Sequence, residues 1–95
     1  MKICAFCGSP AECPHHMVFG RGLRALADED NLVMDMCNKH HTLGDVKERI
    51  HDNPAAEALS KIAGEYKWML DRVADEAMQE VLIEEFRGRY GRSYI

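Results

Sequence analysis

Two short pairs of metal-binding residues constrain this chain more than any other feature of its sequence. Two residues separate Cys4 from Cys7, and the same gap separates Cys37 from His40. Such a gap lets the chain fold around a zinc ion so that both donor atoms face it. The four residues therefore predict a closed structural zinc site of the Cys3His type. The alternative is that the cysteines are free and pack as small apolar side chains.

A chain of this length has a reason to bind zinc. With 95 residues, it is expected to be a single domain with a modest core, and very small domains often depend on metals or disulfides. No apolar run is long enough to predict a membrane span, and the first residues do not read as a signal peptide. We therefore expect a cytoplasmic protein, in which cysteines are more often metal ligands than disulfide partners. The odd cysteine, Cys13, is expected in the core, with replacement of His40 as the fourth ligand as the alternative.

Four histidines remain when His40 is assigned to zinc. His15 and His16 are adjacent, and adjacent side chains on a strand point to opposite faces, so the pair can supply one metal ligand and one base. A zinc ion that joins the two pairs would bring the segment leading to His15 and His16 close to His41. This argument predicts a second site built beside the first, although two histidines can also simply meet in a polar loop. His51 is interpreted as structural or as a helix cap, with metal binding as the alternative.

The first half of the chain predicts small elements. Residues 2–10 read as a short strand with a tight turn, and residues 15–20 and 31–37 read as two strands of a hairpin. The segment 20–30 between them is expected to be a loop. A helix is expected to begin just after Cys37.

The second half predicts one long helix that begins with Asn53 as N-cap and Pro54 in the first turn. The alternative is a break between Asp71 and Gln79, although no Pro or Gly forces one there. Trp68 lies off the centre of the apolar stripe and is interpreted as a contact surface. The stripe predicts a core-facing helix or a homodimer. Its members are Leu59, Ile62, Ala63, Tyr66, Met69, Leu70, Val73, Ala77 and Val81.

Four short motifs, "HHMVFG", "MCNKHH", "IHDNP" and "YGRSYI", stand in an order that resembles the HNH nucleases. These are the zinc-containing branch of the His-Me finger (ββα-metal) fold, and the chain is most similar to small phage-encoded HNH-like zinc proteins. The resemblance runs from Cys4 to Ile95, and the helical middle is its least specific part. It implies a small, mostly helical α+β fold. A zinc-stabilised, treble-clef-like ββα finger would occupy residues 1–52, and a helical extension would occupy residues 53–95.

The resemblance also implies roles for single residues. His16 matches the general base, and Asn31 matches the residue that orients the base. His15 and His41 match ligands of a catalytic divalent cation such as Mg²⁺, Mn²⁺ or Ni²⁺. Two departures stand out: the spacing from Asn31 to the second zinc pair is one residue longer than in typical HNH proteins, and a proline precedes the histidine pair, where many relatives have an acidic or polar residue.

Charge bears on the substrate. A formal net charge of −4 argues against a protein that coats nucleic acid by bulk charge. Arg21, Arg24 and Lys39 flank the histidines, however, and are expected to reach phosphates of DNA. The C-terminal arginines are expected to form a solvated surface, with contact to phosphates as the alternative if the C-terminus folds back; they are Arg87, Arg89 and Arg92.

Two functions from different classes follow. The first is a metal-dependent HNH endonuclease of phage or prophage origin that hydrolyses DNA phosphodiester bonds. The second is a non-catalytic zinc-binding module of HNH-like fold that binds nucleic acid or a protein partner. A zinc-ribbon redox protein is disfavoured, because the second pair is Cys-x2-His rather than Cys-x2-Cys.

Overall fold

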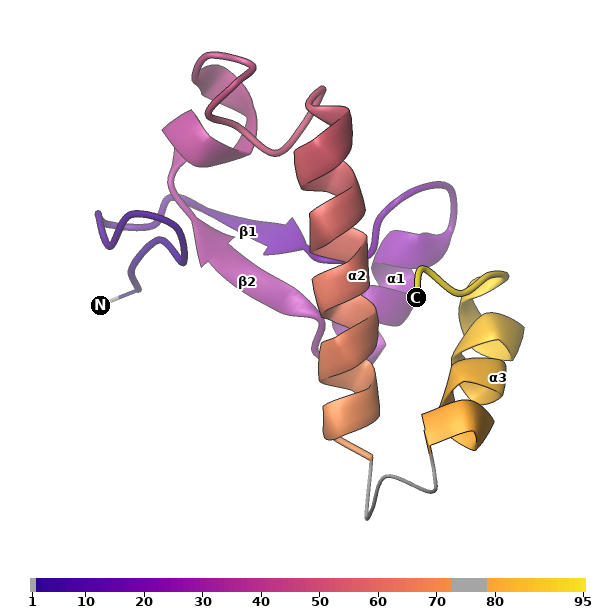
Figure 1. Cartoon of the computed structure of the whole chain (residues 1–95). Coiled ribbons are helices and arrows are strands. Elements are labelled where there is room, and N and C mark those ends of the chain that lie inside the picture. The colour runs from indigo at the N-terminus through magenta and orange to yellow at the C-terminus, as the bar shows by residue number, and fades with distance from the viewer. Residues whose placement is uncertain (1, 73–78) are drawn as a thin grey trace.

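The computed structural model describes residues 2–72 and 79–95 (Figure 1). The fold is a mixed α/β arrangement in which a two-stranded sheet is accompanied by helices. None of the helices in these two stretches combines the length and the apolar character needed to cross a membrane. In chain order the elements are β1 (Cys13–His16), α1 (Leu23–Glu29), β2 (Val33–Met36), the π-helical turn η1 (Lys39–Leu43), α2 (Pro54–Leu70) and α3 (Gln79–Tyr90).

The predicted hairpin is present, with shifted bounds. β1 pairs antiparallel with β2, and His15 lies opposite Met34. β1 begins and ends earlier than the expected strand 15–20, whereas the expected N-terminal strand amounts to a single bridge between Ile3 and Pro10.

The connection between the strands is not the expected loop, because it contains α1. Gly22, with a φ of 78°, precedes this helix, and Ala27 is fully buried on its inner face. Leu23, Leu26 and Ala27 recur at the three- and four-residue steps that give a helix one apolar side, and that side packs into the core. Seven residues make the pattern too short to stand out in the sequence.

The prediction of one long helix is wrong. α2 ends at Leu70, and α3 begins at Gln79 and packs back against α2 (Figure 1). The predicted start is confirmed, since Asn53 Oδ1 accepts a hydrogen bond of 3.2 Å from the backbone N–H of Ala56. Val73 and Ala77 of the predicted stripe lie outside the described residues.

The buried face of α2 also differs from the predicted stripe. Leu59, Tyr66 and Leu70 are exposed. Trp68, which was interpreted as a contact surface, is only 4% exposed and belongs to the core. The residues of α2 that are buried are Ser60, Gly64, Glu65, Trp68 and Met69.

Close approach of α2 to the segment that follows β1 explains this shift. A Cβ atom at Gly64 would lie 2.8 Å from Val18 Cγ2, so only glycine allows this contact without displacement. The neighbouring Ser60 is then buried because its hydroxyl has polar partners on β1 and just after it. The homodimer stays a prediction. The surface that could form it is now the exposed apolar face of α2 rather than the expected long stripe.

Side chains from both halves of the sequence form the main core, so residues before and after Asn53 belong to one folded unit. A second, smaller cluster of Cys4, Met36, Cys37 and Ile50 lies beside the zinc pairs. The main core consists of Val18, Ala27, Leu32, Trp68, Met69, Leu82, Phe86 and Tyr90.

Candidate metal centres

The two predicted zinc pairs come together. Cys4, Cys7, Cys37 and His40 each offer one donor atom, and these atoms all lie within 4.8 Å of one another. The Sγ atoms of Cys7 and Cys37 are 3.7 Å apart, and Cys37 Sγ lies 3.2 Å from His40 Nδ1. Zn–S bonds of about 2.3 Å in a tetrahedron separate two sulfurs by about 3.8 Å. The four residues can therefore bind a metal ion such as zinc.

The backbone around Cys4 favours the thiolate form that binds metal. Burial by itself would raise the pKa of Cys4. Hydrogen bonds from the backbone N–H groups of Cys37, Cys7 and Phe6 outweigh this effect and lower the pKa to about 6. The amide of Phe6 donates to Cys4 Sγ over 3.3 Å. The loop closes because Gly8, at a φ of 75°, donates its N–H to the carbonyl of Cys4. A thiolate held by amides is the form of cysteine that ligates metals.

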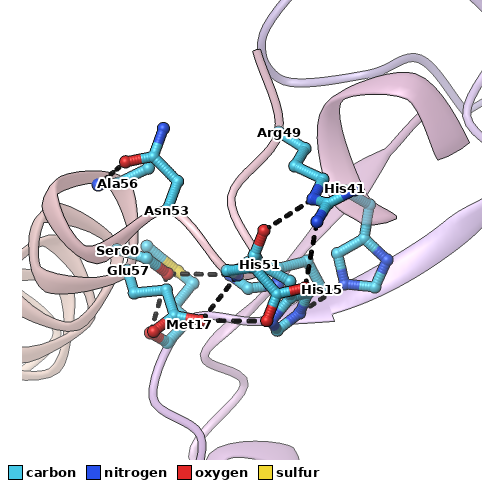
Figure 2. Close-up of polar contacts among 10 residues, drawn as sticks. His15, Met17, His41, Arg49, His51, Asn53, Ala56, Glu57 and Ser60 are labelled. Carbon is cyan, nitrogen blue, oxygen red and sulfur yellow. Dashed lines mark hydrogen bonds and ion pairs between the residues drawn. The ribbon is translucent and has the colours of Figure 1, made fainter. Parts of the chain in front are cut away.

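A second cluster consists of three histidines. His15 comes from β1, His41 from η1 and His51 from the loop before α2, and their donor nitrogens also lie within 4.8 Å of one another. Figure 2 shows the three histidines close together beside α2. The Nε2 atoms of His41 and His51 are only 2.9 Å apart. A pocket of about 170 Å³ lies beside them; its lining also includes Pro14, His16, Phe19 and Arg24.

The hydrogen bonds of His15 decide which of its nitrogens is free. Ser60 Oγ donates to the carbonyl of Met17 over 2.8 Å, so it accepts from His15 Nε2 at 2.7 Å. His15 Nδ1 then carries a lone pair. This atom is buried and has no hydrogen-bond partner among the described residues, and the whole side chain is 1% exposed. Such a nitrogen is costly to leave unsatisfied, and a bound cation would satisfy it.

His41 is held in the same way. The Cys13 thiol donates to the carbonyl of Met36 and lies 3.2 Å from His41 Nδ1, so it accepts from that nitrogen. His41 Nε2 is thus left with its lone pair directed into the cluster. Metal-binding histidines typically have their other nitrogen engaged by a polar neighbour of this kind. His51 Nδ1 lies 3.8 Å from the carboxylate of Glu57, which is too long for a hydrogen bond but places a carboxylate beside the ring.

Burial and neighbouring charges favour the neutral form of two of the three histidines. Burial, with smaller contributions from His41 and His51, lowers the pKa of His15 to about 3. Burial and the neighbouring His51 also lower the pKa of His41. Neutral imidazole is the form that binds metal.

The contacts of His51 and Cys13 answer two questions that the sequence left open. Asn53, not His51, caps α2, and the His51 ring faces His41. A backbone hydrogen bond from His51 N–H to the His41 carbonyl brings the loop into this position. No regular spacing could have indicated this ligand, because it comes from a loop. Cys13 is partly buried against the smaller core, as expected, and in addition orients His41.

His16, the neighbour of His15, points elsewhere, as a strand requires. Its Nε2 atom is 2.8 Å from Asp28 Oδ1, its side chain is 23% exposed, and it lines the pocket. Asn31, which was expected to orient this histidine, occupies the turn after α1 with a φ of 59°. Its side chain makes no hydrogen bond within the described parts of the chain. Asp28 holds His16 instead, and the sequence offered no signal for it because α1 was not predicted.

The expected phosphate-binding residues differ in their surroundings. Arg24 lines the pocket, and Arg21 is exposed in the preceding turn. Lys39 Nζ lies 3.6 Å from Glu48 Oε2, so its charge is partly compensated.

Comparisons with known proteins reach only part of the chain. No family model matches it, and no solved structure matches it. A protein of Escherichia coli K12 named "Uncharacterized protein YdfU" is 44% identical over 39 residues, which are 40% of this chain. The match spans only 11% of the length of that protein. The similarity is thus confined to a segment, and it shows no family for the chain as a whole.

Proposed function

We propose that this chain is a metal-dependent endonuclease of the HNH kind that hydrolyses phosphodiester bonds in DNA. The proposal includes a ββα-metal finger stabilised by zinc at Cys4, Cys7, Cys37 and His40. One observation supports it: the two adjacent histidines of β1 line one pocket but have different surroundings. His15 is buried with an unpartnered nitrogen in the histidine cluster, while His16 stands half-buried at the pocket wall.

The environment of His16 suits a general base. If Nε2–H donates to the carboxylate of Asp28 at 2.8 Å, Nδ1 keeps the lone pair that accepts a proton from water. The Asp28 carboxylate then stabilises the imidazolium that forms, as in other Asp–His pairs. Partial exposure lets water and substrate reach the ring.

The histidine cluster fits a divalent cation. His15, His41 and His51 would hold it, and three protein ligands leave positions open, as is typical of catalytic sites. When bound, the cation would stabilise negative charge on the phosphate and on the leaving oxygen. Three imidazole nitrogens and no carboxylate in the cluster favour a transition metal over Mg²⁺. Among the expected cations we therefore favour Ni²⁺ over Mg²⁺, with Zn²⁺ also suited to such ligands.

Plasmid nicking with Mg²⁺, Mn²⁺, Ni²⁺ or Zn²⁺ added tests the proposal, with His16→Ala assayed beside the parent. We expect the substitution to lower the cleavage rate by about a hundred- to ten-thousand-fold, the usual contribution of a general base, with folding and zinc content unchanged. Asp28→Asn removes the carboxylate that contacts His16. Asn31→Ala, three residues later in the same turn, serves as its control. Only Asp28→Asn should slow cleavage if Asp28 orients the base.

The non-catalytic zinc module is the alternative outcome. It takes over if folded, zinc-loaded parent protein cuts DNA with none of the metals, or if His16→Ala cuts as fast as the parent.

A further inference from the structure

Ion pairs sort the basic side chains into two groups. Lys67 on α2 pairs with Asp71 at 3.1 Å, and Arg87 on α3 pairs with Glu84 at 2.7 Å. Arg89 is held between Glu29 and Asp30. By contrast, Arg24, Lys61 and Arg92 make no ion pair with any residue in the described ranges. Lys2, Arg21 and Lys47 likewise make no ion pair within these ranges. In a chain with more acidic than basic residues, a group of uncompensated cations that lie near one another leaves a locally positive surface.

Contacts between side chains link these three cations to the histidine pocket. Arg24 and Phe19 both line it. Lys61 Nζ lies 4.6 Å from the centre of the Phe19 ring and 5.8 Å from that of Tyr94, and the Arg92 guanidinium lies 4.8 Å from the Tyr94 ring centre. Aromatic rings hold the two outer cations without neutralising them. The series runs from the pocket, across α2, to the C-terminal tail.

The tail is anchored, so this arrangement does not depend on a loose end of the chain. Glu65 on α2 is fully buried, and its carboxylate accepts hydrogen bonds from Ser93 Oγ, at 2.6 Å, and from the backbone N–H of Tyr94. Figure 1 shows the tail after α3 returning toward α1 and α2. Arg92, for which a solvated position was the favoured expectation, thus lies over the ring of Tyr94, which Lys61 also approaches.

We propose that Arg24, Lys61 and Arg92 form a track for the DNA phosphate backbone that leads from the histidine pocket to the C-terminal tail. This inference rests on the proposed function and adds residues from α2 and the tail to the substrate-binding surface. Cations spaced along a surface suit a polyanion with regularly spaced charges. A cation at the three histidines would continue the positive line into the pocket.

Binding of a fluorescently labelled short DNA duplex, followed by anisotropy over a range of salt concentrations, tests the track. His16→Ala protein serves as the parent, so that cleavage cannot interfere. Lys61→Gln and Arg92→Gln are compared with Lys67→Gln and Arg87→Gln, which remove cations of the same kinds from α2 and α3 where an acidic partner already compensates them. Melting temperature and zinc content establish that each variant is folded.

We expect Lys61→Gln and Arg92→Gln each to weaken binding and to reduce the slope of log affinity against log salt by about 0.9, the value for one lost phosphate contact. Lys67→Gln and Arg87→Gln should match the parent, and Lys61→Arg should restore binding. The track is refuted if the Lys61 and Arg92 variants bind like their controls.

A plasmid-nicking assay with the wild-type chain tests the proposed nuclease function separately from the phosphate track. Cleavage without any effect of Lys61 and Arg92 on binding would remove the track and leave the nuclease. Weakened binding in both variants of a protein that never cuts would leave the track on a DNA-binding module.

Discussion

The two metal clusters lie in neighbouring parts of the same small fold and differ in almost every chemical respect. The first has three sulfurs and one nitrogen in two short turns, and its sulfurs are spaced as zinc requires. The second has three nitrogens from a strand, a turn and a loop, and it borders a pocket. Four ligands close a metal site, whereas three leave it open to substrate. The difference is the one expected if the first cluster has a structural role and the second has the catalytic role proposed above.

His40 and His41 carry this contrast within one turn. Neighbouring residues of a helical turn project in different directions, so His40 reaches Cys37 while His41 reaches His51 and Cys13. η1 thereby joins the two clusters rigidly, and a metal bound in the first would hold a ligand of the second in place.

The largest expected effect is loss of the first cluster. Cys37→Ser should leave the chain largely unfolded, because structural zinc sites contribute about 10–16 kcal/mol in zinc-finger peptides, more than the stability of a typical small domain. Circular dichroism and metal analysis measure this, with about one tightly bound zinc expected in the parent. A well-folded parent that carries no zinc would overturn the assignment.

The next largest effect is expected from the adjacent residues His40 and His41, one in each cluster. His40→Ala should damage folding, whereas His41→Ala should leave zinc content and circular dichroism intact, abolish cleavage and weaken binding of the second metal. His51→Ala should behave like His41→Ala if it is the third ligand. Metal titration of the zinc-loaded protein distinguishes these cases. Equal loss of folding in the His40 and His41 variants would mean that the two clusters do not have separate roles.

Ser60 should matter for the second cluster alone. Without its hydroxyl, nothing holds His15 as the Nε2–H form, and loss of such a supporting contact typically costs about ten- to a hundredfold in metal affinity. Ser60→Ala should show this loss in competition titrations with Ni²⁺, and Ser60→Thr should recover it. Nitrogen chemical shifts of the His15 ring report the tautomer directly. Unchanged shifts and affinity in Ser60→Ala would exclude the positioning role.

The smallest effect is expected from glycine substitutions. A methyl group at Gly64 would meet Val18, at a cost of about 1–3 kcal/mol for overpacking, offset by about 1 kcal/mol of helix propensity. Gly88 on α3 has open space at the same position, so Gly88→Ala should stabilise the protein by about 1 kcal/mol. Urea unfolding compares the two. Gly64→Ala should also weaken the second cluster more than the first, because α2 carries Ser60 and Glu57; equal effects on both would contradict this.

The donors of the first cluster could be predicted because the spacing that identifies them spans only a few residues of sequence. A gap of two residues confines the sulfurs of Cys4 and Cys7 to one turn, and the matching pair at Cys37 and His40 leaves few other partners. The alternation of His15 and His16 was equally local, since it follows from the geometry of any strand. The start of α2 at Asn53 and Pro54 belongs to the same class.

The partners of the second cluster could not be predicted in this way. Many residues separate each of these partners from the histidine that it contacts. His51 was interpreted as structural or as a cap, Ser60 lay outside the predicted apolar stripe, and Asp28 lay in a segment that was expected to be a loop. The sequence allowed a break between α2 and α3 but did not require one, because no Pro or Gly marks it. The return of α3 depends instead on the packing of Phe86 against Trp68.

The sequence by itself determined the zinc pairs, the opposite faces of the histidine pair and the start of α2, because short spacings and backbone geometry act over a few residues. Only the tertiary structure decided which nitrogen of His15 and of His41 is free and which uncompensated cations lie near the pocket. Those outcomes depend on hydrogen bonds and ion pairs between distant segments, such as Ser60 with His15 and the tail with Glu65. These contacts form only after α2 has packed against β1, at the position that Gly64 allows.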